Sequence, residues 1–433
     1  MRGFQALRSR FRGALLRPGE EGYDEARRVW NGAIDRRPAL IARCAGADDV
    51  AVAVRFGREH DLLVSVRGGG HAVAGHAVAD GGLMIDLSPM KAVRVDPGAR
   101  TARAAGGVLL GELDRATQRF GLAVPSGIVS HTGIGGLTLG GGLGHTMRRF
   151  GLTVDNLRSV DLVTAEGEPL HVDAWTEPEL FWGLRGGGGN FRIATAFEYR
   201  LHPVGPIRLG GPIFWSLADA PEVLRHLRDF APQAPDELGM VLFARLAPPG
   251  PLVPPEHYGR PVLGLTLTWV GDPAEGQRAV APLRRVAPPI ADNLRPLPYL
   301  AVQSLVDGGN QHGMHYHWRS QRIPMLADEV IDVLCGLTDT SPRRCPIPPG
   351  SSWAAPPARS TPTPPPSGSA VTGSSSASSP PGHRPTPTGN GTWPGSAAAP
   401  TPCAPTGPGC SPISSPTRAP PGSRPPTASG SSA

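Results

Sequence analysis

The sequence predicts an α+β protein with two folded domains, at residues 36–206 and 207–340, and a tail that does not fold. Three observations support this prediction. Three glycine-rich turns, each beside an apolar strand-like run, fall within the first of these ranges. Strand and helix patterns continue through the second range without such turns, which is typical of a separate α+β domain. The composition then changes abruptly after residue 340.

The charge of the chain is concentrated in this tail. The 433 residues carry 42 basic and 36 acidic side chains, a net charge of +6. Six of the basic residues, all arginine, lie after residue 340, where no acidic residue occurs, so the two signs balance at 36 each before it. A balanced folded part gives no support to a nucleic-acid-binding surface, and we expect no nucleic-acid partner.

The cysteines and the hydropathy pattern indicate the cellular compartment. No Cys-x-x-Cys pair occurs, so neither a zinc cluster nor a disulfide framework is predicted, and isolated thiols fit a reducing compartment. No apolar run is long enough to cross a bilayer or to serve as a signal peptide. We therefore predict a cytoplasmic protein with no membrane partner. The five cysteines are Cys44, Cys335, Cys345, Cys403 and Cys410.

The chain before residue 206 predicts an N-terminal arm and then a domain of strands and helices. Residues 1–35 suggest an irregular arm with one helical piece at 23–30. A helix is expected to begin at an N-cap provided by Asp48 or Asp49. The pattern then predicts strands at 38–44, 62–66, 82–87 and 92–96, and helices at 48–60 and 109–120.

The first glycine-rich turn follows the strand at 62–66. Three consecutive glycines, Gly68 to Gly70, allow backbone N–H groups to point toward a ligand, and such a concavity suits phosphate. Arg67 either adds charge or caps the strand, and His71 lies beside whatever the phosphates carry. The alternative is an ordinary glycine-rich turn. The stretch is not a Walker loop, because no Gly-Lys-Ser/Thr follows.

Two further glycine-rich segments strengthen the case for a ligand. Residues 125–144 resemble a low-complexity linker, but Leu and Ile alternate with the glycines, and Thr132 and Thr138 add hydroxyls. An ordered backbone against a flat ligand is the better interpretation. The third cluster, 184–191, leads into a predicted strand at 193–201. Three such turns in one domain suggest a large dinucleotide held from several sides.

Residues 207–340 predict the second domain. The helix from residue 273 has a well-defined start, with Asp272 as cap, Pro273 in the first turn and Glu275 at the third position. We expect this domain to close over the reactive end of the cofactor. Its elements are predicted strands at 212–215, 240–246, 262–270 and 314–320, and helices at 221–230, 273–286 and 325–337.

Taken together, these motifs resemble the FAD-linked oxidases of the vanillyl-alcohol oxidase type, in particular the berberine-bridge-enzyme-like branch. The resemblance covers roughly residues 20–340. It implies a PCMH-type FAD-binding domain of two subdomains, followed by a substrate domain with an antiparallel sheet and helices. The matching segments are Arg67 to His71, Pro125 to Gly144, Gly151 to Leu157, Gly187 to Phe191 and Phe197 to Pro203.

The resemblance implies FAD as the cofactor, bonded through its 8α-methyl group to His71. Val129 stands where some relatives have a second, cysteine tether, so a single covalent bond is expected. The alternative is that His71 merely lines the pocket. The other predicted cofactor-binding residues are Val66, Arg67, Gly68, Gly69, Gly70, Gly75, His76, Ser130, Thr132, Gly133, Gly135, Gly136, Thr138, Gly141, Gly142, Gly144, Asn190 and Ile193.

The chemistry that the resemblance implies is oxidation of an alcohol, an amine or an activated C–H bond. A hydride passes to the flavin, a protein base takes a proton, and O2 reoxidises the flavin to give H2O2. We expect a secondary alcohol of a sugar or natural product as substrate. Tyr316 is the candidate base, with structural packing as the alternative. Nearby histidines 312, 315 and 317 lack acidic partners, so no metal site is expected.

Three departures from the family pattern stand out. Arg192 follows Asn190-Phe191 where relatives usually have glycine, and His145-Thr146-Met147 replaces an aromatic pattern. Residues 341–433 lack the family's closing strand and helix, and their Pro, Ser, Gly, Thr and Ala content predicts disorder. This tail is either genuine or the product of a reading-frame change near codon 340, which translation of the other two frames would test. A second hypothesis is therefore a catalytically impaired FAD-binding remnant.

Overall fold

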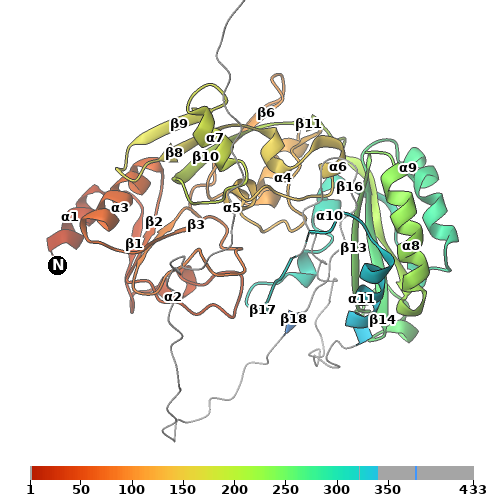
Figure 1. Ribbon diagram of the computed structural model, residues 1–433. Helices are drawn as coiled ribbons and strands as arrows, with labels where there is room; N and C mark the ends of the chain where they lie inside the picture. Colours follow the sequence, from red (N-terminus) through yellow and green to blue (C-terminus); the bar gives the residue numbers. More distant parts are fainter. Residues whose placement is uncertain (1, 321, 340–375, 378–433) are drawn as a thin grey trace, which may run out of the picture. The chain divides into compact units, whose positions relative to one another are not determined.

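The computed structural model describes residues 2–320, 322–339 and 376–377 (Figure 1). All of these residues belong to one compact unit, Met1–Pro380. The expectations for residues 341–433 therefore lie outside the described residues, except at 376–377. The domain boundaries at residues 35, 206 and 340 stay predictions.

A small, mostly parallel sheet carries the first glycine-rich turn. Strands β2 (Leu40–Arg43), β4 (Leu83–Asp86) and β3 (Val64–Arg67) run parallel, and β1 (Ala14–Leu16) pairs with β2 antiparallel at the edge. Helix α3 (Ala47–Glu59) makes the crossover from β2 to β3. All four residues of β4 are buried, as expected for a central strand covered on both faces. The end of β3 delivers the chain into the triple glycine, as the sequence predicts.

The N-terminal arm is more regular than predicted. Helix α1 (Arg2–Arg10) packs Leu7 against the core that holds α3, β1 extends the sheet, and α2 (Tyr23–Ala26) follows. The expected cap of α3 is also wrong. Gly46 is the N-cap residue, and the carboxylate of Asp49 accepts the amides of Arg12, Gly13 and Ala45 at 2.8, 2.9 and 2.8 Å. Asp49 therefore binds the arm to the sheet instead of capping the helix.

A second, antiparallel sheet completes the N-terminal half of the unit. Its core is built around Phe197 and Tyr199, which are fully buried, and around α4 (Leu110–Gln118). The second glycine-rich segment includes a short helix, α5 (Ile134–Leu139), which the sequence does not predict. The strand order is β5 (Val93–Asp96), β6 (Thr101–Ala105), β10 (Ile193–Arg200), β8 (Leu157–Val163) and β9 (Pro169–Asp173), with α7 (Pro178–Leu184) following β9.

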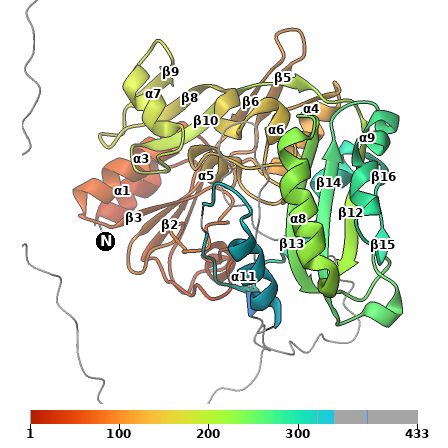
Figure 2. The same cartoon turned by 45° about the vertical axis from the view of Figure 1, so that its right-hand side comes forward.

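The third sheet is antiparallel and lies within the predicted substrate domain. Helices α8 (Ala220–Phe230), α9 (Pro273–Val280) and α11 (Asp328–Asp339) accompany it (Figure 2). Helix α9 begins as predicted, since the Asp272 carboxylate accepts the Ala274 amide at 2.7 Å. The strand order is β13 (Leu238–Leu246), β14 (Pro261–Trp269), β12 (Ile207–Ser216) and β15 (Ala291–Asp292), and β16 (Arg295–Pro298) also pairs with β12.

A segment after β16 returns to the N-terminal arm. The Trp30 indole N–H donates to the Asn310 carbonyl oxygen at 2.7 Å, and Asn31 exchanges hydrogen bonds with the backbone of Tyr316 at 2.9 and 3.0 Å. These contacts link residues about 280 positions apart. The segment contains α10 (Tyr299–Gln303), a 3-10 turn (Asp307–Gly309) and β17 (His315–Tyr316), which pairs with β18 (Ser376–Ala377).

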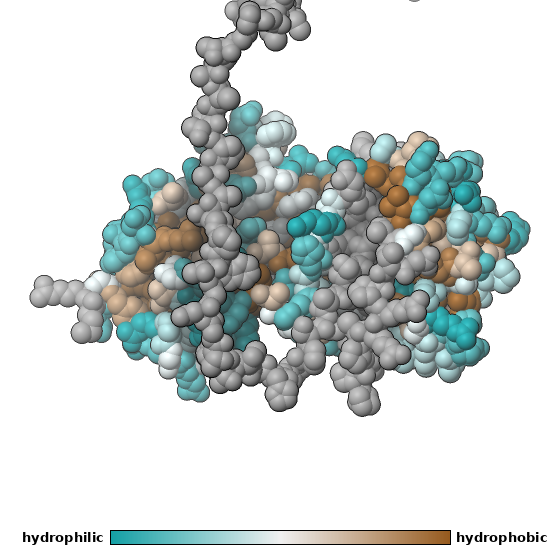
Figure 3. Space-filling model, turned by 60° about the horizontal axis from the view of Figure 1, so that its bottom comes forward, coloured by the Kyte–Doolittle hydropathy of each residue, from teal (hydrophilic) through white to brown (hydrophobic). Residues whose placement is uncertain are grey.

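Short elements join the sheets to one another. Strand β7 (Leu122–Ala123) pairs with β11 (His202–Pro203), and helix α6 (Met147–Phe150) follows the second glycine-rich segment. Among the described residues, no helix is long and apolar enough to cross a membrane. On the face in Figure 3, hydrophilic and hydrophobic residues alternate over the surface.

Candidate FAD site

The first glycine-rich turn presents bare backbone amides. Among the described residues, no protein atom accepts a hydrogen bond from the amides of Gly68, Gly69 or Gly70. Gly70 has φ +66°, a conformation that favours glycine, and its carbonyl oxygen accepts the Trp30 amide at 3.0 Å. Three consecutive unpartnered amides are suited to bind an anion such as a pyrophosphate.

The second glycine-rich segment lies directly against this turn. A Cβ added to Gly69 would lie 2.3 Å from the Gly133 nitrogen, so only glycine allows the two backbones this approach. Within the described part of the chain, the amides of Gly133, Gly135 and Gly136 also have no acceptor. Among the described residues, a Cβ at Gly136 would meet no atom within 4 Å outside its own helix, so there is free space around this glycine. Together the two segments form a glycine cradle, which we define as Gly68–Gly70 and Gly133–Gly136.

His71 leaves the cradle into a group of aromatic rings. Its Nε2 lies 3.2 Å from Nδ1 of His131, and the His312 ring lies 4.9 Å from the His131 ring. The His71 ring stacks on Trp30 at 4.1 Å, and Trp30 in turn stacks on Tyr316 at 3.6 Å between ring centres. The imidazole is therefore held in place from two sides.

The electrostatics of this group keep the histidines uncharged. Burial, with smaller contributions from the neighbouring His131 and His312 rings, lowers the pKa of His71 to about 3. Burial also lowers the pKa values of His131 and His312. At neutral pH the His71 ring is a neutral imidazole, the form in which a ring nitrogen has a lone pair for bond formation.

Arg67 fixes the start of the turn through contacts with α2 and β4. Its Nη1 donates to the Ala26 carbonyl oxygen, and its Nε lies 4.0 Å from the buried Asp86 carboxylate. A Cβ on Gly70 would lie 3.3 Å from this Nε. These contacts give Arg67 partners within the protein at the end of β3, and its predicted part in cofactor binding stays a prediction.

The other polar side chains predicted for the site make contacts within the protein. The backbone and hydroxyl of Ser130 donate to the Asp307 carboxylate at 2.8 and 2.5 Å. The buried Thr138 hydroxyl pairs with Tyr199 at 2.8 Å, and the Asn190 amide donates to the Gly187 carbonyl oxygen at 2.8 Å. Each of these three side chains therefore has a hydrogen-bond partner within the protein.

The remaining predicted residues differ in how they contribute. Gly75, Gly141 and Gly142 have positive φ values of 73, 113 and 81°, so they shape the backbone. A Cβ on Gly144 would lie 1.6 Å from the Ser126 carbonyl oxygen, so close packing fixes this glycine. Of the others, His76 is exposed, Val66 is 36% exposed, Thr132 is partly buried and Ile193 begins β10.

Tyr316 is placed as a packing residue. Its hydroxyl donates to the Gln311 carbonyl oxygen at 2.7 Å, and burial raises its pKa above the usual value. A base must release its own proton before it can accept one, and both features oppose this. The placement favours the structural alternative over the role of base.

Several residues in and around the site were not found by sequence reasoning. Trp30, His131 and Asp307 make direct contacts with the predicted residues, yet only His131 carried a signal, its position inside the second glycine-rich segment. Asp114 lies buried beside Gln303, whose amide donates to it at 3.3 Å, and burial raises its pKa to about 7. Within the described ranges, no group of His, Cys, Asp or Glu has an arrangement that holds a metal ion.

The site fits a flavin dinucleotide. The cradle offers unpartnered amides for phosphates, tolerates no side chain at Gly69, and ends beside a neutral imidazole. A Walker-type nucleotide site would need a lysine and an acidic residue. Neither takes part in the contacts of the cradle described above.

Comparison with known proteins agrees with this fit. Residues 38–173 match a family model described as an FAD binding domain. An FAD-linked oxidoreductase of Dictyostelium discoideum is 33% identical over 336 residues, which cover 77% of this chain and 71% of the relative. The (R)-6-hydroxynicotine oxidase of Paenarthrobacter nicotinovorans is 32% identical over 331 residues, covering 76% and 70%.

Solved structures show the same fold. The crystal structure of 6-hydroxy-D-nicotine oxidase from Arthrobacter nicotinovorans has a TM-score of 0.69 and 32% identity, covering 76% of this chain and 72% of that one. A chitooligosaccharide oxidase has the same TM-score at 21% identity over 80% and 74%, so it shows likeness of fold alone. The chain therefore belongs to the FAD-linked oxidoreductases of the vanillyl-alcohol oxidase type, with a PCMH-type FAD-binding domain.

Proposed function

We propose that this chain is an FAD-dependent oxidase that holds its cofactor through one covalent bond to His71. The observation that carries the proposal is the neutral His71 imidazole directly after three unpartnered amides. In the proposed reaction, a hydride leaves a C–H bond of a secondary alcohol or a similar group, in a sugar or natural product, and O2 is the final acceptor. FAD supplies the hydride-accepting ring when bound.

The residues of the chain would divide the work of holding the cofactor. The amides of Gly68–Gly70 and Gly133–Gly136 would bind the pyrophosphate, while Trp30 and His131 hold the His71 ring in position. The new bond would join a ring nitrogen of His71 to the 8α carbon. It would replace the imidazole N–H and one methyl C–H, and O2 would take both hydrogens as H2O2. Val129 has no thiol for a second bond.

The test is whether flavin stays with the denatured protein. Purified protein is precipitated with acid, and the flavin absorbance of pellet and supernatant is compared. We expect the wild-type pellet to keep the flavin and the His71→Ala pellet to lose it. His257→Ala, a histidine in a 3-10 turn of the substrate domain, serves as the matched control and should keep it. Flavin in the wild-type supernatant would contradict the covalent bond but not FAD binding.

A second candidate function rests on the composition of residues 341–433, which contain no Leu, Tyr, Asp or Glu. If these residues replace the family's closing segment, the chain binds FAD without oxidising a substrate. Anaerobic bleaching separates the two hypotheses, with a panel that includes 6-hydroxynicotine and chitooligosaccharides. Bleaching by any member supports the oxidase, whereas bound FAD that no member bleaches favours the impaired remnant.

A further inference from the structure

The His71 ring is hydrogen-bonded to a second imidazole. Its Nε2 lies 3.2 Å from Nδ1 of His131, and among the described residues His131 is the one side chain that hydrogen-bonds this ring. Trp30 covers a face of the ring, but its indole N–H is bonded elsewhere, to the Asn310 carbonyl oxygen. One of the two imidazoles must therefore donate a proton to the other.

A contact on the other side of His131 gives this hydrogen bond its direction. Burial lowers the pKa of His131, whereas the Asp307 carboxylate and a hydrogen bond to the Asn310 backbone act to raise it. A hydrogen bond raises the pKa of a base when the base donates it, so the acceptor is the Asn310 carbonyl oxygen, which has a second lone pair beside the Trp30 bond. Since Nδ1 of His131 faces His71, the donor is Nε2. A neutral imidazole has one N–H, so Nδ1 accepts the proton of His71 Nε2.

The backbone holds His131 in this position from both sides. The preceding residue, Ser130, donates its amide and hydroxyl to the Asp307 carboxylate at 2.8 and 2.5 Å. The carbonyl oxygen of the following residue, Thr132, accepts the Leu110 amide at 2.9 Å. The negative charge of Asp307 favours the protonated form of the nearby His131 ring. The site therefore holds a fixed proton acceptor and a carboxylate that stabilises the cation formed there.

We propose that His131 is a catalytic residue in the formation of the covalent flavin bond, and that it accepts the Nε2 proton of His71 while Nδ1 of His71 bonds to the 8α carbon. The inference rests on the proposed function and gives His131 a chemical role beyond holding the ring. Because Nε2 is engaged with His131, Nδ1 is the nitrogen left to form the bond.

Atoms and electrons balance in this step. The lone pair of His71 Nδ1 forms the new bond to carbon, and the N–H bond at Nε2 breaks as its proton passes to Nδ1 of His131. A second proton and two electrons come from one C–H bond of the 8α-methyl group. O2, the oxidant of the proposed function, takes up two electrons and two protons as H2O2. Removal of the Nε2 proton makes Nδ1 a stronger nucleophile, as an adjacent base does for other activated side chains.

The test follows the appearance of acid-stable flavin. Full-length protein is produced in riboflavin-starved cells and mixed with FAD in air, and samples are precipitated with acid at intervals. We expect the wild type to gain acid-stable flavin about a hundredfold faster than His131→Phe, the lower end of what general base catalysis contributes. Both proteins should bind FAD before precipitation, which quenching of flavin fluorescence measures.

Two further variants separate proton transfer from packing. His131→Ala should also be slow, and added imidazole should restore part of the lost rate, because it can occupy the vacated space and accept the proton. His312→Phe is the matched control. The His312 ring lies 4.9 Å from the His131 ring and 6.4 Å from the His71 ring, but within the described chain it forms no hydrogen bond with His71. This variant should gain acid-stable flavin at the wild-type rate.

Four outcomes would overturn the role of His131 while leaving the covalent bond in place. They are equal rates in the wild type and His131→Phe, the same slowing in His312→Phe, no effect of imidazole on His131→Ala, and an NMR spectrum of the isolated flavin peptide with the 8α carbon on Nε2. A different result separates the proposed function. Wild-type protein that binds FAD but never gains acid-stable flavin refutes the covalent bond, and the role of His131 with it.

Discussion

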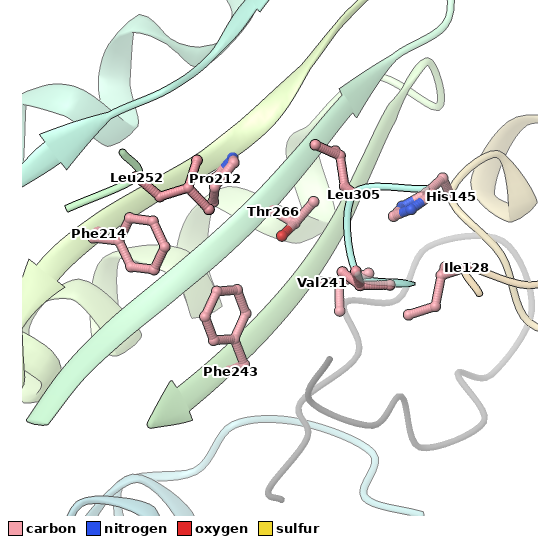
Figure 4. A pocket seen from close by; sticks show the side chains of 10 residues that line it. Ile128, His145, Pro212, Phe214, Val241, Phe243, Leu252, Thr266 and Leu305 are labelled. Carbon is pink, nitrogen blue, oxygen red and sulfur yellow. The ribbon is translucent and has the colours of Figure 1, made fainter. Parts of the chain in front are cut away.

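The glycine cradle and the third sheet use glycine for opposite purposes. In the cradle, Gly69 lets one backbone touch another at Gly133, and the recognising groups are main-chain amides. In the third sheet, Gly264 makes room for the Phe243 ring, and the nearby group without a hydrogen-bond partner among the described residues is a side chain, His145 (Figure 4). Backbone recognition depends on glycines that cannot be replaced, whereas side-chain recognition can change one residue at a time. The glycine cradle can therefore be recognised in the sequence, whereas the surroundings of His145 cannot.

The largest expected effect breaks the cradle. Gly69→Ala places a methyl group 2.3 Å from the Gly133 nitrogen, so the two segments must separate. We expect a loss of about 3 kcal/mol in unfolding free energy and loss of bound FAD. Urea denaturation and flavin absorbance measure the two effects. Gly136→Ala is the control for stability, because its methyl group meets no atom of the described residues outside its own helix. An equal loss in both variants would contradict this account.

A smaller effect on stability is expected at the hydrogen bonds between Ser130 and Asp307, which join the second glycine-rich segment to the segment after β16. Asp307→Ala removes the acceptor of two Ser130 hydrogen bonds and should cost about 2 kcal/mol in unfolding free energy, with weaker FAD retention. Asp328→Ala removes an exposed carboxylate that pairs with Arg225 and Arg228, and it should lower the unfolding free energy clearly less than Asp307→Ala does. An equal loss of unfolding free energy in the two variants would show that the Asp307–Ser130 hydrogen bonds stabilise the protein no more than an exposed ion pair does.

The third prediction concerns pH and the substrate sheet. The pKa of His145 is about 4 in the folded protein and 6.5 when unperturbed, so acid protonates the unfolded chain first. Stability should fall as pH drops below 6.5, by at most about 1.4 kcal/mol per pH unit from this residue, and the loss should level off below 4. Denaturation at pH 7, 6 and 5 should show a shallower slope for His145→Phe. Val241→Ala, which removes no charge, should keep the wild-type slope.

The smallest effect tests the aromatic group beside His71. Tyr316→Phe removes one hydrogen bond to Gln311 but keeps the ring stacked on Trp30. Unfolding free energy should fall by about 1 kcal/mol or less, and oxidation of any substrate found should persist. Loss of oxidation at unchanged stability and FAD content would restore Tyr316 as the catalytic base.

Local signals explain what the sequence predicts correctly. The strand before the triple glycine and the start of helix α9 both depend on neighbouring residues, whereas the antiparallel pairing of the third sheet was implied only by the family resemblance. Helix α5 was missed because glycine-rich composition disfavours a helix, and only its packing into the second sheet's core stabilises it.

Contacts between distant residues account for most of what was not predicted. Three hydrogen-bonded pairs illustrate this: Asp49 with Gly13 of the arm, His71 with His131, and Ser130 with Asp307. The partners lie 36, 60 and 177 positions apart in the sequence. Alternation identifies two faces of β13 but does not say which one borders a cavity. The pocket face around Phe243 is therefore visible only in three dimensions.

The hydrogen bonds between Trp30 and Asn31 and the backbone at Asn310 and Tyr316 have a consequence for synthesis. On the ribosome, the triple glycine emerges early, but the ring that supports His71 gains its second neighbour only when residue 316 has been translated. Closing such a long loop is slow compared with local folding. We therefore expect this stack of rings to be completed late, and a chain that ends before residue 316 would keep Trp30 and His131 beside His71 but lack the Tyr316 ring that stacks on Trp30.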